Sequence, residues 1–88
     1  MVTAKRVQTG LRIEQSTLKV LKGLAEYFDI SLGDLVEGIV LHAFDGKSPF
    51  DESTREVIDQ LRAVYGLRLH AHDSHLLVEE NSELGGLT

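Results

Sequence analysis

A short stretch of alternating side chains near the N-terminus constrains the fold more than any other feature of the chain. Apolar or β-branched side chains occupy one face of residues 5–13, at Val7, Thr9, Leu11 and Ile13. The other face carries Arg6, Gln8, Gly10 and Arg12. A period of two predicts a half-buried β-strand. Since no second strand follows at hairpin distance, its backbone N–H and C=O groups need a partner from elsewhere. The simplest partner is the same strand of a second chain, which predicts a homodimer.

Two helices are predicted after this strand. Apolar residues recur at helical spacing from about Gln15 to Phe28. Ser31 followed by Asp34 is a typical start of a second helix, Leu32 to Phe44. The apolar face of the second helix is too wide for a single neighbouring helix, which predicts burial on two sides, as at a dimer axis. The expected dimer core comprises Leu11, Ile13, Leu21, Leu35, Val36, Ile39 and Val40.

The rest of the chain is predicted to be a C-terminal extension over residues 47–80. Ser48-Pro49 is suited to begin a third helix at about 49–65, and Gly66 to end it. Such a helix would shield apolar surface of the second helix. Residues 67–70 alternate and are compatible with a short strand, whereas residues 81–88 are polar and glycine-rich, which predicts a flexible tail.

Composition excludes several classes of function. The chain has no cysteine, hence no disulfide, thiolate metal site or cysteine nucleophile, and this favours a cytoplasmic protein. It has no apolar run of about 18 residues, so no membrane span is expected. We find no glycine-rich phosphate loop and no nucleophile with a base at motif spacing. The expectation is a protein that is not an enzyme and needs no cofactor.

Charge is distributed unevenly. Residues 1–30 carry five bases and three acids, whereas residues 31–88 carry four bases and eleven acids, within a net charge of −5. A basic end joined to an acidic remainder suits a protein that meets an anion with one edge only. The acidic extension is in turn a candidate surface for a protein partner.

The order of strand, helix, short break and capped helix resembles the ribbon-helix-helix (Arc/MetJ-type) family of DNA-binding proteins. The matching stretches are RVQTGLRI, EQSTLKVLKGLAEYFD and ISLGDLVEGIVLHAFDG, which together cover residues 5–46. The resemblance implies a mainly α fold with one short β-strand, an intertwined homodimer whose two strands pair as an antiparallel ribbon. It also implies a sequence-specific transcriptional regulator, a repressor or an antitoxin, that inserts this ribbon into the major groove of double-stranded DNA.

Specific residues follow from this resemblance. The strand positions that would face the bases are Gln8, Gly10 and Arg12. Arginine pairs with guanine and glutamine with adenine in the major groove. Phosphate contacts are expected from Lys5 and Arg6, and from backbone N–H groups at Ser31, Leu32 and Gly33, where a helix N-terminus attracts anions. Asp34 counts against this last site, because its charge would repel a phosphate.

Two departures from the family pattern keep other functions open. Gly10 has no side chain to read a base, and the inter-helix turn holds Asp29 where the family usually has glycine. Asp tolerates left-handed backbone angles better than most residues, so the turn remains possible. The first alternative is a dimeric protein–protein adaptor of the same fold without DNA binding. The second is a metal-responsive regulator that uses His70, His72 and His75, because His70 and His72 are spaced as a metal pair on a strand would be and His75 follows closely.

Overall fold

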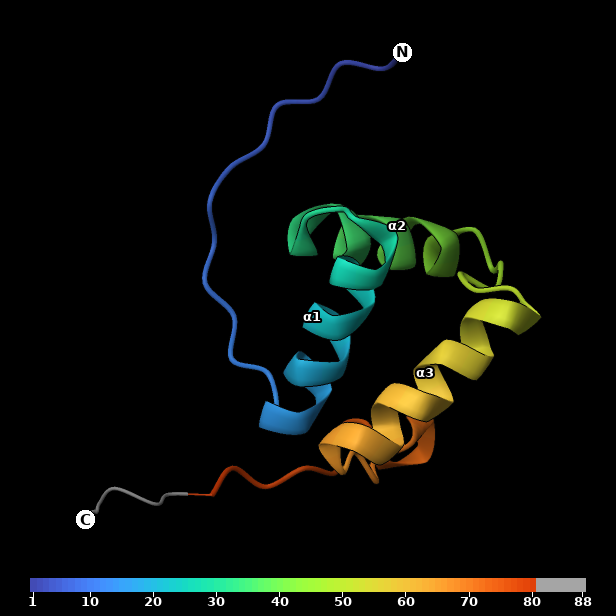
Figure 1. Cartoon of the computed structure of the whole chain (residues 1–88). Coiled ribbons are helices and arrows are strands. Elements are labelled where there is room, and N and C mark those ends of the chain that lie inside the picture. Colours follow the sequence, from blue (N-terminus) through green and yellow to red (C-terminus); the bar gives the residue numbers. More distant parts are fainter. Residues whose placement is uncertain (81–88) are drawn as a thin grey trace.

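The computed structural model describes residues 1–80, and within that range the chain forms three α-helices and a short 3-10 turn (Figure 1). The helices are α1 (Gln15–Phe28), α2 (Leu32–Phe44) and α3 (Glu52–Tyr65), and the turn η1 is Ala71–Asp73. The predicted boundaries of the first two helices are confirmed. The third helix begins later than predicted, because the Asp51 side chain, and not Pro49, forms its start. The predicted flexible tail, residues 81–88, lies outside the described residues.

The predicted fold class, a ribbon-helix-helix unit with a short β-strand, is wrong. Residues 5–13 are extended, but residues 1–80 contain no strand or sheet. A strand needs a neighbour that accepts and donates its ladder hydrogen bonds. No segment of the described chain lies beside residues 5–13 in that way, and their backbone forms a single blue trace (Figure 1) with no ladder hydrogen bonds to another described segment. The stretch 67–70, also compatible with a strand, is irregular.

Helix α1 starts at a carboxylate cap and ends in a left-handed turn. The Glu14 side chain accepts hydrogen bonds from the backbone N–H groups of Ser16 and Thr17, at 3.1 and 2.8 Å. Bonds from the hydroxyls of Ser16 and Thr17, together with these N–H groups, lower the pKa of Glu14 from 4.5 to about 2. At the other end, Asp29 adopts φ 58° and ψ 44°, so this residue does accept the conformation for which glycine is more usual.

The Glu14 cap predicts a loss of stability in acid. The pKa of Glu14 in the folded state lies below the value of 4.5 for the free side chain. The contribution of the cap to the free energy of unfolding is therefore fully present above pH 4.5 and is lost as the pH falls towards 2. Because Glu14 is exposed, we expect that contribution to be at most about 1 kcal/mol. Urea unfolding of wild type and Glu14→Gln should differ most at neutral pH, and the difference should vanish near pH 2. A difference that is constant with pH would contradict the cap.

Helix α2 follows after a break of three residues. Its N-cap is Ser31, whose hydroxyl accepts a hydrogen bond from the Asp34 N–H at 3.1 Å, as the sequence predicts. Its end is closed at Gly46, which has a φ of 69°, and by the Lys47 N–H, which donates to the His42 carbonyl at 2.8 Å. These local signals explain why the span of α2 was predictable.

A small core lies around α1, which packs against both α2 and α3. Leu24 is the most deeply buried side chain, with 2 % of its surface exposed, and it clusters with Ala25 and Leu35. Val20 on α1 is also buried. Gly23 explains the approach of α3: a Cβ there would lie 3.1 Å from Leu61 Cδ2, so the missing side chain is what lets Leu61 sit against α1. Helix α3 adds Val57, Ile58 and Leu61 to the cluster that holds Leu35 of α2, so the expected shielding of α2 by α3 is partial: Val40, Leu41 and Phe44 stay exposed.

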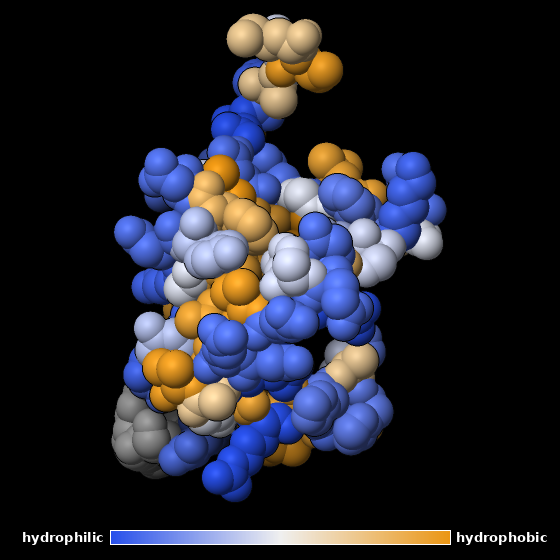
Figure 2. All heavy atoms as spheres, turned by 45° about the vertical axis from the view of Figure 1, so that its right-hand side comes forward, coloured by the Kyte–Doolittle hydropathy of each residue, from blue (hydrophilic) through white to orange (hydrophobic). Residues whose placement is uncertain are grey.

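The most apolar helix, α2, leaves much of its apolar face exposed. Of the residues of α2, only Leu35 is buried, while Val40, Leu41 and Phe44 expose 37 %, 62 % and 78 % of their surface. Figure 2 shows apolar side chains open to solvent between polar ones on the face it presents. None of the helices in residues 1–80 has both the length and the apolar character needed to cross a membrane.

Candidate nucleic-acid interface

The N-terminal arm, residues 1–13, is the most basic part of the molecule. It carries Lys5, Arg6 and Arg12 and no acidic residue, in a chain whose net charge is −5. Every residue of the arm is exposed. The apolar positions share this exposure, with Val7 and Leu11 open by 79 % and 71 %. The arm thus presents both its cations and its apolar side chains to whatever approaches it.

Arg6 is held by two carboxylates of α2. Its Nη2 atom lies 2.5 Å from Asp34 Oδ1 and 2.7 Å from Glu37 Oε1, and its Nε atom donates to Glu37 at 3.2 Å. The hydrogen bond to Glu37, followed by the charges of Glu37 and Asp34, raises the pKa of Arg6. The same hydrogen bond lowers the pKa of Glu37. Since these side chains are about half exposed, the cluster is open to competition by solvent ions.

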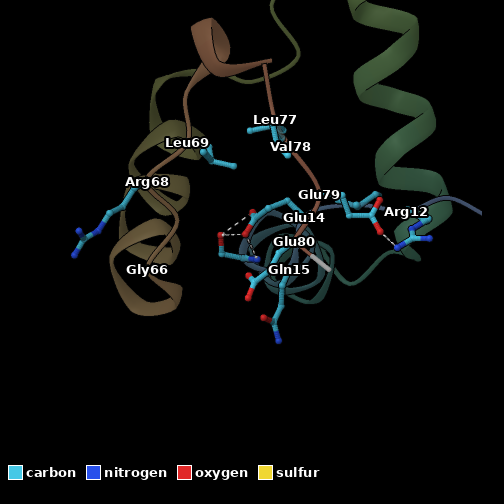
Figure 3. A pocket seen from close by; sticks show the side chains of 12 residues that line it. Arg12, Glu14, Gln15, Gly66, Arg68, Leu69, Leu77, Val78, Glu79 and Glu80 are labelled. Carbon is cyan, nitrogen blue, oxygen red and sulfur yellow. Dashed lines mark hydrogen bonds and ion pairs between the residues drawn. The ribbon is translucent and has the colours of Figure 1, made fainter. Parts of the chain in front are cut away.

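Arg12 also faces a carboxylate. Its Nη2 atom pairs with Glu79, and Figure 3 shows the two side chains pointing toward one another. The pair lies at the edge of a hollow of about 760 Å³ between the end of the arm, the end of α3 and residues 77–80. Leu69, Leu77 and Val78 line this hollow beside the charged groups (Figure 3). The C-terminal segment and the arm are therefore neighbours, although they lie far apart in the sequence.

The other residues expected at DNA lie in two places. Gln8 and Gly10 are exposed on the arm between Arg6 and Arg12, and a Cβ at Gly10 would meet open space. Ser31, Leu32 and Gly33 form the start of α2, where the Ser31 hydroxyl is used as the helix cap. The carboxylate of Asp34 lies in this first turn and binds Arg6. The arm and the start of α2 are thus brought together by an ion pair.

The residues expected in a dimer core fall into two groups. Leu35 is buried in the single chain, and Leu21, Val36 and Ile39 are half-buried. Leu11, Ile13 and Val40 are exposed. Leu21, Leu35 and Ile39 already contribute to the three-helix core, so the exposed group and the outer face of α2 remain for a partner.

The three C-terminal histidines do not converge. The rings of His70 and His72 stack with centroids 6.1 Å apart, and His72 Nε2 lies 3.6 Å from Asp73 Oδ1. Nowhere in residues 1–80 do three His, Asp or Glu side chains gather as metal ligands would. His42 Nδ1 lies 2.7 Å from the Gly38 carbonyl within α2.

Sequence reasoning missed the carboxylates that hold the arm. Asp34 was expected to repel a phosphate, but its pairing with Arg6, 28 residues away, has no local signal in the chain. The same holds for Glu37, 31 residues from Arg6, and for Glu79. The uneven charge of the chain was the one available signal, because it predicts that the basic end attracts the acidic remainder.

Comparison of the chain with protein-family models, with curated proteins and with solved structures finds no match.

Proposed function

We propose that the protein is a homodimeric, cytoplasmic transcriptional regulator that binds double-stranded DNA through its N-terminal arms. The observation that carries this proposal is the arm itself: thirteen exposed residues with three cations and no anion, of which two arginines contact the rest of the described chain through exposed ion pairs. Extended basic arms of this kind enter DNA grooves, where arginine side chains contact bases or follow the narrow minor groove.

Exposed apolar side chains support the dimer. Val7 and Leu11 on the arm expose 79 % and 71 % of their surface, and Leu41 and Phe44 on α2 expose 62 % and 78 %. A second copy that covered these side chains would remove apolar surface from water, which favours association. A stable interface takes about 800 Å² from each partner.

Self-association would bring two arms together. The outer face of α2 is apolar at Val40, Leu41 and Phe44, and beside Gly38 it offers open space for a close helix neighbour. Two chains joined there would present six arm cations in one assembly. Doubling the contacts raises the affinity for DNA, because the second arm binds at a high effective concentration.

Arg12 and Gln8 are the arm residues best suited to read bases, because their side chains pair with guanine and adenine edges. We expect Arg12→Ala to weaken binding to the best duplex selected from a random-sequence pool by about 1–3 kcal/mol. Fluorescence anisotropy at several salt concentrations measures this. Lys22→Ala, which removes one exposed cation from α1, serves as the control and should have a much smaller effect. Unchanged affinity for Arg12→Ala would contradict base contact by this residue.

A dimeric adaptor without DNA binding is the second candidate. It is favoured by exposed Leu76, Leu77 and Val78, which precede Glu79 and Glu80 in the extension. An apolar segment beside acids suits a protein partner whose groove is apolar and rimmed by basic residues. In that case no duplex from the pool would bind above the level of non-specific DNA.

A further inference from the structure

The cluster of Arg6, Asp34 and Glu37 stands in direct competition with any anion that the arm would bind. Arg6 uses both Nε and Nη2 on carboxylates of α2, with four contacts between 2.5 and 3.2 Å. A phosphate offers the same geometry of two oxygens to a guanidinium. Arg6 cannot satisfy both α2 and a DNA backbone with the same N–H groups.

The position of the cluster makes the competition effective. Asp34 and Glu37 lie on α2, which is fixed to the core through Leu35, so the carboxylates belong to a rigid element. The arm continues into α1 at Glu14 and all of its residues are exposed, so the ion pairs of Arg6 are what hold it against α2. The ion pairs therefore draw a free segment onto a fixed acidic surface. Arg12 is held in the same manner by Glu79.

We propose that Asp34 and Glu37 form an autoinhibitory latch, which holds Arg6 on α2 until a DNA phosphate displaces the two carboxylates. This inference rests on the proposed function and adds a regulation of the same site. Since the pairs are exposed, the latch weakens DNA binding modestly and is itself weakened by salt. Its removal exposes Arg6 to phosphate without any change in the arm.

The test compares the double variant Asp34→Asn/Glu37→Gln with Glu26→Gln/Asp59→Asn, which removes the same charge from exposed positions of α1 and α3. Anisotropy with a selected duplex at low salt should show a gain in affinity of about two- to fivefold for the first pair beyond that of the second. This additional gain in affinity should disappear when Arg6→Gln is introduced into both double variants. An excess gain that persists with Arg6→Gln would overturn the latch, because it would then be a general effect of charge.

The latch can also be observed without DNA. The Nε–H signal of Arg6 in an NMR spectrum, assigned by its loss in Arg6→Lys, should shift in Asp34→Asn/Glu37→Gln and stay in place in the control pair. An Nε–H signal that does not shift overturns the latch. Duplex binding by wild type with no excess gain in the double variant overturns the latch alone. No binding by any variant overturns the proposed function and, with it, the inhibitory role.

Discussion

Leu24→Ala is expected to lower the free energy of unfolding by about 2–5 kcal/mol. Leu24 lies on α1 with 2 % of its surface exposed, and it clusters with buried Ala25 of the same helix and Leu35 of α2. The loss has two parts. Three carbon atoms are no longer removed from water on folding, and they leave a cavity that a core of this size cannot close. A chain of this length holds only about 4–13 kcal/mol in total, so the variant should be partly unfolded at 37 °C.

Leu76→Ala is the matched control, because it makes the same chemical change at a side chain that is 72 % exposed. It should alter the free energy of unfolding by no more than about 0.5 kcal/mol. Urea unfolding followed by circular dichroism at 222 nm measures both variants. Equal midpoints for the two would contradict the placement of the core around α1.

Leu41→Glu is expected to abolish the dimer while leaving the single chain folded. Leu41 is 62 % exposed on α2, so a carboxylate there meets water in the monomer. In the proposed dimer it would be buried without a partner, which costs several kcal/mol. The dissociation constant should therefore rise by at least about a hundredfold. Light scattering coupled to gel filtration should give a mass near 9.7 kDa in place of about twice that value.

Val64→Glu provides the control for the added charge. Val64 is 71 % exposed on α3, away from the proposed contact, and its replacement should leave the dimer intact. Persistence of the dimer in Leu41→Glu would exclude α2 as the interface. A wild-type chain that stays at 9.7 kDa at high concentration would exclude the dimer itself.

The helices could be predicted because their ends are set by local chemistry. Ser31 caps α2, Gly46 closes it, and Gly66, with a φ of 70°, ends α3. Each of these signals lies within a few residues of the boundary that it marks. The alternation at Val7, Leu11 and Ile13 predicted a strand wrongly, because it describes side chains only. Whether such a segment joins a sheet depends on a second segment to which its backbone can bond.

The packing of the helices and the ion pairs of the site depend on distant residues. Periodicity gives α3 an apolar face but does not say which helix that face covers. The missing side chain of Gly23 lets Leu61 bring α3 against α1, while Val40, Leu41 and Phe44 of α2 stay exposed. The cations of the arm were visible in the sequence. Their partners Asp34, Glu37 and Glu79 were not, because folding alone brings them near.

The claim that the arm binds DNA is tested most directly by two triple variants of equal charge. The first is Lys5→Gln/Arg6→Gln/Arg12→Gln on the arm, and the second is Lys19→Gln/Lys22→Gln/Lys47→Gln on exposed positions of α1 and the connector before α3. Both change the net charge from −5 to −8. Anisotropy of a selected duplex, titrated at several salt concentrations, measures the affinity and its salt slope. We predict that the arm variant loses binding and the salt slope, whereas the helix variant keeps most of both. Equal losses in the two variants, or binding that survives in the arm variant, would contradict the proposed role of the arm.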